Sequence, residues 1–142
     1  ATSTRAYEKV RIFEAWNVIE SNAPSFSETL GIGIIDSGIE ISHREFSTFP
    51  KVNIIGAPDA EIDRERGGHG TQIAGIIGAN NVSATSSANY REGHMNGILS
   101  GVSGLPYIIE NRRDGKDEPS TYRVLKEARS LAKQKVPIVN IT

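Results

Sequence analysis

Two short segments of the sequence carry residues suited to catalytic chemistry. Asp36 follows an apolar run and precedes a Ser-Gly turn, and His69 stands between two glycines. A buried carboxylate beside a histidine holds one tautomer of the ring and stabilises the imidazolium that forms when the ring takes a proton from a nucleophile. Asp36 and His69 therefore have the side-chain types of two members of a Ser-His-Asp hydrolytic triad.

Asp36 and His69 are too far apart in sequence to be neighbours on one helix, so the fold must bring them together. The run at 30–35 is short and rich in isoleucine, which predicts a strand buried on both faces of a parallel sheet. Apolar and small residues over 71–79 predict a closely packed helix, and Thr71 is suited to cap it. Asp36 is thus predicted at the carboxyl end of a strand, where parallel α/β sheets carry function.

Helix-like and strand-like segments alternate along the rest of the chain. Apolar residues at helical spacing predict helices over 7–20 and 122–135. Short apolar runs predict strands over 52–55, 105–109 and 136–141, and the polar stretch 80–96 predicts a surface loop. No linker divides the chain, so we expect one α/β domain with a parallel sheet.

The composition excludes several classes of function. Sixteen Lys and Arg against 17 Asp and Glu give a formal charge of −1, so no basic field predicts nucleic acid or an anionic membrane as a partner. The absence of cysteine excludes disulfides, thiolate metal sites and a cysteine nucleophile. No apolar run approaches the roughly 18 residues of a membrane-spanning helix. These residues leave the cellular location open.

Two longer motifs surround the candidate pair. Residues 33–46 (GIIDSGIEISHREF) resemble the aspartate motif of the subtilisin-like serine proteases, and residues 69–78 (HGTQIAGIIG) are similar to the histidine motif of that family. The resemblance continues in Phe13-Glu-Ala-Trp16, in the turn at 97–102, and in the segment 136–142, a strand that usually ends in Asn-Met-Ser in the family. The similarity therefore covers nearly the whole chain.

The resemblance implies a three-layer, parallel-sheet α/β fold, of which residues 1–142 form about half as the N-terminal part of a single peptidase domain. It implies hydrolysis of a peptide or protein substrate, with His69 as general base and then acid, and Asp36 as the carboxylate that orients it. The oxyanion-hole asparagine and the nucleophilic serine belong to the second half in this family, so we expect the chain to be inactive alone. Secretion is favoured by the resemblance only.

The serines inside the chain do not match the pattern of a nucleophile. Ser103 is the strongest candidate, but it lacks the Gly-x-Ser-x-Gly pattern and the strand-turn-helix setting of a nucleophile elbow. The other serines after His69 fall in expected loops or at helix edges, where solvation or capping explains them. The nucleophile is therefore expected outside these residues.

We expect no metal or other cofactor. The three histidines are His43, His69 and His94. No two of them have the His-x-x-x-His spacing of a metal site, and no neighbouring carboxylate completes a set. The resemblance adds calcium as an alternative, with Asn80, Asn81 and Glu45 at the matching positions. The stretch after Asn81 is poor in carboxylates, however, whereas calcium takes about six to eight oxygen ligands.

Three other interpretations concern binding. A non-catalytic member of the same fold would keep the scaffold as a binding or regulatory module. The segment 31–36 has the first two glycines of a dinucleotide fingerprint but lacks the third, so nucleotide binding is not expected. Arg112 and Arg113 follow the third predicted strand and would either favour acidic peptides or form a solvated loop. The apolar strand at 136–141 predicts self-association through an open sheet edge.

Overall fold

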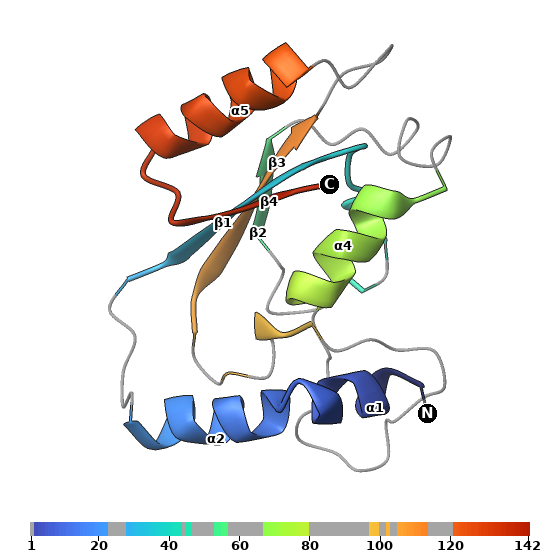
Figure 1. Ribbon diagram of the computed structural model, residues 1–142, viewed down its shortest axis with the longest axis vertical. Helices are drawn as coiled ribbons and strands as arrows, with labels where there is room; N and C mark the ends of the chain where they lie inside the picture. Colours follow the sequence, from blue (N-terminus) through green and yellow to red (C-terminus); the bar gives the residue numbers. More distant parts are fainter. Residues whose placement is uncertain are drawn as a thin grey trace.

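The computed structural model describes residues 2–22, 28–43, 45–46, 53–56, 67–79, 97–99, 102, 105–113 and 121–142 (Figure 1). Four helices lie in these ranges: α1 (Thr2–Lys9), α2 (Ile12–Asn22), α4 (His69–Gly78) and α5 (Thr121–Lys133). Four strands lie there as well: β1 (Leu30–Asp36), β2 (Asn53–Gly56), β3 (Tyr107–Arg113) and β4 (Ile138–Ile141).

The four strands form one sheet in the order β2-β3-β1-β4, and every pair is parallel. Parallel neighbours need crossover connections, which the intervening helices provide. The strand β1 lies inside the sheet between β3 and β4, and its last five residues are buried. The predicted parallel α/β fold is therefore confirmed, and β1 is its centre.

Helices α4 and α5 cover opposite faces of the sheet (Figure 1). A Cβ atom added at Gly33 would lie 2.5 Å from Leu131 Cδ1, so this position of β1 faces α5. The next residue, Ile34, packs in the core with Ala74 of α4 and with Ile109 of β3. Successive residues of a strand point to opposite faces, so the two helices form the outer layers of a three-layer arrangement.

The N-terminal segment forms two helices, whereas the sequence predicted one helix over 7–20. Arg11 lies between them with a left-handed φ of 58°, and this conformation ends α1. Across the break, Tyr7 makes edge-to-face ring contacts with Phe13 and Trp16 at centroid distances of 6.4 and 6.2 Å. The Trp16 indole Nε1 donates a hydrogen bond of 2.8 Å to the carbonyl of Ile98. The packing of these rings is thus associated with the break.

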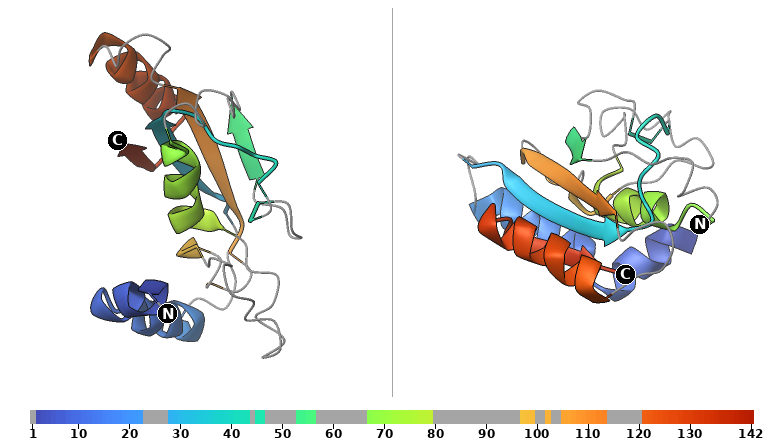
Figure 2. Two further views of the ribbon diagram at one scale, coloured as in Figure 1. Left: turned by 90° about the vertical axis from the view of Figure 1, so that its right-hand side faces the viewer. Right: turned by 90° about the horizontal axis from the view of Figure 1, so that it is seen from above.

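The helix pair α1 and α2 lies at the end of the sheet where the strands begin (Figure 2). The catalytic candidates are therefore at the opposite end, because Asp36 ends β1. None of the helices in the described ranges is both long and apolar enough to cross a membrane. The predicted loop at 80–96 lies outside the described residues.

Strand and helix boundaries differ from the predictions at functionally relevant places. The strand β3 continues to Arg113, four residues beyond the predicted end, so Arg112 lies in the sheet and not in a loop. Helix α4 begins at His69, two residues before the predicted start. The backbone of His69 is therefore part of the helix and does not belong to the loop before it.

Candidate active site

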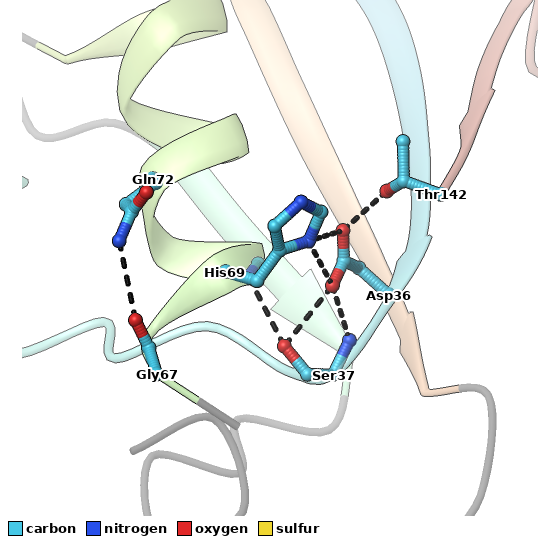
Figure 3. A network of polar contacts seen from close by, with 7 residues as sticks. Asp36, Ser37, Gly67, His69, Gln72 and Thr142 are labelled. Carbon is cyan, nitrogen blue, oxygen red and sulfur yellow. Dashed lines mark hydrogen bonds and ion pairs between the residues drawn. The ribbon is translucent and has the colours of Figure 1, made fainter. Parts of the chain in front are cut away.

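The structure brings Asp36 and His69 into direct contact (Figure 3). Asp36 is the last residue of β1, and His69 is the first residue of α4. The His69 Nδ1 atom lies 3.0 Å from both carboxylate oxygens of Asp36. An ionised carboxylate only accepts hydrogen bonds, so Nδ1 carries a proton, and in the neutral form of the ring Nε2 presents its lone pair. This is the tautomer that a general base requires.

The two side chains have very different exposure. Asp36 is buried, with 3% of its side chain accessible, whereas 52% of the His69 side chain is exposed. The carboxylate is thus screened from water, while the ring remains open to a reacting group. Burial is the largest single influence on the pKa of Asp36 and raises it, but hydrogen bonds from Thr142, Ser37 and His69 together lower the pKa below its ordinary value. Asp36 is therefore ionised at neutral pH.

Ser37 links the carboxylate to the helix that carries His69. Its backbone N–H and its hydroxyl donate hydrogen bonds of 2.6 and 3.0 Å to Asp36 Oδ1. The same hydroxyl oxygen accepts a bond of 3.1 Å from the Gly70 N–H, one of the amides at the start of α4 that lack a helical partner. From the sequence, Ser37 was interpreted only as a turn residue.

Thr71 makes a second link between the two motifs. Its hydroxyl oxygen accepts a hydrogen bond of 2.8 Å from the backbone N–H of Glu40. The prediction that Thr71 caps the helix is wrong, because the helix begins earlier: the N-cap residue is Gly68, which has a left-handed φ of 72° and no side-chain hydrogen bond to the helix. Thr71 instead connects the helix to the chain that follows Asp36.

Gly70 allows the closest backbone approach at the site. A Cβ atom at this position would lie 2.0 Å from the carbonyl oxygen of Gly38. Real Cβ atoms do not approach backbone oxygen so closely, and neither backbone segment could move without shifting Asp36 or His69. Glycine at position 70 is thus a condition for the contact between the carboxylate and the ring.

Thr142 is a third partner of Asp36, and sequence reasoning missed its side chain. Its hydroxyl donates a hydrogen bond to Asp36 Oδ2 (Figure 3). Its backbone N–H donates to the carbonyl of Ile35 at 3.3 Å, which continues the pairing of β1 with β4. The signal in the sequence was the final Asn-Ile-Thr of the segment, whose family counterpart ends in serine.

The described residues offer no metal centre: they contain no group of three or more His, Asp or Glu side chains able to hold an ion. His43 Nδ1 lies 3.4 Å from the backbone nitrogen of Glu45, and its ring lies beside Phe46. Glu45 is buried. His94, Asn80, Asn81 and Ser103 all lie outside the described residues. The calcium alternative and the exclusion of Ser103 therefore stay predictions.

Arg112 lies in β3 and not in the solvated loop that was one of its two interpretations from the sequence. Its guanidinium forms a 3.0 Å ion pair with Glu110 and a 3.1 Å hydrogen bond with Gln134, and it lies 3.8 Å from Glu127 of α5. These contacts join β3 to the α5 face of the sheet. Arg112 is therefore engaged within the chain and is not part of a solvated loop, whereas a preference for acidic peptides stays a prediction.

Comparison with known proteins agrees with this geometry. The family model described as the subtilase family matches residues 27–142, which include both Asp36 and His69. The chain belongs to the subtilase family. The match also includes the four strands of the described ranges, together with α4 and α5.

Two curated relatives support the assignment to the subtilases. "Subtilisin-like protease 2" of Pseudogymnoascus destructans is 34% identical over 109 residues, covering 68% of this chain and 26% of that protein. "Putative subtilisin-like proteinase 1" of Encephalitozoon cuniculi is 31% identical over 94 residues, covering 60% of this chain and 19% of that protein. No solved structure matches the chain significantly. This subtilase chain thus spans about a quarter or less of the curated relatives it matches.

Proposed function

We propose that the protein containing this chain is a serine endopeptidase, in which Asp36 and His69 are two members of the catalytic triad. The observation that carries the proposal is the contact of His69 Nδ1 with both oxygens of a buried carboxylate at 3.0 Å. Family membership and the names of the relatives support peptide-bond hydrolysis. The proposed substrates are peptides or proteins, and neither nucleic acid nor a membrane is proposed as a partner.

In the proposed reaction, His69 Nε2 takes the proton of a serine hydroxyl as the serine oxygen bonds to the scissile carbonyl carbon. The imidazolium then gives this proton to the leaving amine, the C–N bond breaks, and an acyl-enzyme remains. A water molecule then attacks the acyl carbonyl carbon while His69 Nε2 takes one of its protons. His69 gives this proton to the serine oxygen as the ester bond breaks, which releases the acid product and regenerates the serine. Asp36 stays ionised throughout, because its role is to orient the ring and to stabilise the positive charge on it.

The serine and the oxyanion-hole donor of this proposal come from outside residues 1–142. This placement rests on the subtilase pattern and on the small share of each relative that the chain covers. A gene product without a Gly-Thr-Ser-x-Ala segment beyond Thr142 would contradict the peptidase and favour the alternative, a non-catalytic binding or regulatory module. Reading the coding sequence past Thr142 distinguishes the two.

The isolated chain of residues 1–142 is expected to show no peptide hydrolysis and no labelling by a fluorophosphonate probe. The probe reacts with an activated serine. Within the part of the chain that the structure describes, the serine in contact with Asp36 is Ser37, whose Oγ is already bonded to Asp36 and Gly70. Intact-mass spectrometry after incubation with the probe measures the labelling. The complete peptidase domain, native and heat-denatured, provides the positive and negative controls. Labelling of the isolated chain would overturn this placement of the nucleophile.

The outer edge of β4 is expected to mediate self-association of the isolated chain. β4 pairs with β1 on one side, and no strand in the described ranges pairs with its other side. Ile138, Val139 and Ile141 are 50%, 36% and 52% exposed, and an apolar open edge favours pairing with another chain. Light scattering over a concentration series is expected to show oligomers that the substitution Val139→Lys reduces.

Leu125→Lys is the matched control for this experiment, because Leu125 is also apolar and 50% exposed but lies on α5, away from the edge. A chain that stays monomeric at every concentration would refute edge pairing. An equal effect of both substitutions would assign the association to general surface hydrophobicity instead.

A further inference from the structure

We infer that Thr142 is a positioning residue of the active site, whose hydroxyl holds the Asp36 carboxylate in the orientation that receives the His69 ring. The inference rests on the proposed function for its catalytic meaning. Its structural basis is the hydrogen bond from Thr142 Oγ1 to Asp36 Oδ2, which joins residues 106 positions apart in the sequence (Figure 3).

The register of the sheet explains why the Thr142 side chain reaches the carboxylate. Ile35 of β1 is paired with Ile141 of β4, and the Thr142 N–H donates to the Ile35 carbonyl. The next pair along the ladder is therefore Asp36 with Thr142. Paired residues of parallel strands point to the same face of a sheet, so the hydroxyl and the carboxylate share the face covered by α4. A slip of one residue would turn the hydroxyl away.

The two oxygens of the Asp36 carboxylate accept hydrogen bonds from two different segments of the chain. Ser37 donates to Oδ1 from the residue directly after Asp36, and Thr142 donates to Oδ2 from the end of a neighbouring strand. His69 Nδ1 lies at the same distance from both oxygens, on the remaining side. Rotation of the carboxylate about its Cβ–Cγ bond would lengthen at least one of these bonds. Thr142 thus fixes Oδ2, whereas the two hydrogen bonds from Ser37 fix Oδ1.

The hydroxyl can be separated from the other contributions of Thr142. Its backbone supplies the ladder bond to Ile35, which a substitution of the side chain leaves in place. Valine has the branched shape of threonine without the donor, whereas serine keeps the donor without the methyl group. Comparing Thr142→Val with Thr142→Ser therefore isolates the hydrogen bond. Ile141→Val is the control for a small side-chain change on the same strand, at a half-exposed position.

The experiment uses NMR on the chain of residues 1–142, in the wild type and the three variants. The ¹³C resonance of the Asp36 carboxyl gives its pKa, which is expected to rise in Thr142→Val because a donor to the charged form is lost. The proton on His69 Nδ1 is expected to exchange with water faster in the same variant. Thr142→Ser and Ile141→Val are expected to resemble the wild type in both measurements. Backbone amide spectra and circular dichroism show whether each variant is folded.

Two results would overturn the inference. One is a folded Thr142→Val chain whose Asp36 pKa and His69 proton exchange equal those of the wild type. The other is a Thr142→Ser chain that behaves like Thr142→Val, which would assign the effect to packing of the methyl group. If Thr142→Val does not fold, Thr142→Ala takes its place in the same comparison with Thr142→Ser.

The complete peptidase domain supplies a kinetic test. Thr142→Val is expected to lower kcat by about tenfold with little change in KM, because a mispositioned carboxylate weakens proton transfer and leaves substrate binding intact. An unchanged kcat would contradict the positioning role. A complete domain without peptidase activity would instead refute the proposed function, and the NMR comparison would still decide whether Thr142 orients Asp36.

Discussion

Replacing His69 by alanine in the complete peptidase domain is expected to lower kcat/KM for a peptide substrate by about 10⁴-fold or more. The ring is the proposed proton acceptor, and removal of one triad member typically leaves only the catalysis supplied by substrate binding and the oxyanion hole. Asp36→Asn is expected to have an effect of similar order. An amide in place of the carboxylate can donate to Nδ1, which favours the tautomer with its proton on Nε2. Steady-state kinetics on a fluorogenic peptide measure both losses.

His43→Ala is the matched control for His69→Ala. It removes the same kind of side chain from a histidine that lies beside Phe46 and outside the contact with Asp36. We expect its kcat/KM to stay within about threefold of the wild type, since no catalytic step uses the ring. A His69→Ala enzyme that retained a tenth of the wild-type activity would exclude His69 as the general base.

The substitution Gly70→Ala is expected to destabilise the fold by about 3 kcal/mol or more. The added methyl group would meet the backbone carbonyl of Gly38 at 2.0 Å, and overpacking of this kind typically costs about 1–3 kcal/mol even where flexible side chains can adjust. Here the obstacle is main chain. Either α4 moves away from the segment after Asp36 or the helix start unwinds. Urea unfolding followed by circular dichroism measures the change in the free energy of unfolding.

Gly31→Ala tests whether the effect belongs to the close approach or to the loss of any glycine. A Cβ atom at Gly31 would lie 3.6 Å from Pro137 and 3.7 Å from Val136, which are ordinary contact distances. We expect its free energy of unfolding to stay within about 1 kcal/mol of the wild type. Equal destabilisation by the two substitutions would contradict the steric explanation for Gly70.

Local sequence patterns predicted the parts of the fold that depend on burial. The isoleucine-rich run before Asp36 is the central strand because both faces of β1 are covered, and continuous apolar residues report that environment directly. The break between α1 and α2 was not predicted, because helical spacing continues through Arg11. Its left-handed backbone is seen together with contacts among Tyr7, Phe13 and Trp16, and such tertiary packing is not visible in spacing alone.

Tertiary contacts also limited what the sequence could predict about the candidate site. Asp36 and His69 were identifiable because each stands inside a recognisable motif, and the structure places them in contact. The roles of Ser37 and Thr71 were missed or misassigned, because both depend on how closely α4 approaches the end of β1. The contact made by Thr142 depends on the register between two strands, and pairing across a long sequence separation leaves no local signature.

The bond between Asp36 and Thr142 has a consequence for the order in which the protein matures. During synthesis Asp36 emerges from the ribosome long before Thr142, because the two residues are 106 positions apart. Contacts between such distant residues form late, since the chain between them must first close into a loop. The carboxylate can therefore lie in a folded β1 and still lack one of its donors. Until β4 docks, the nascent chain would hold a histidine and an aspartate without their final alignment. The contact between Asp36 and Thr142 thus depends on the last strand of the described sheet, and the arrangement of the carboxylate is complete only when β4 is paired with β1.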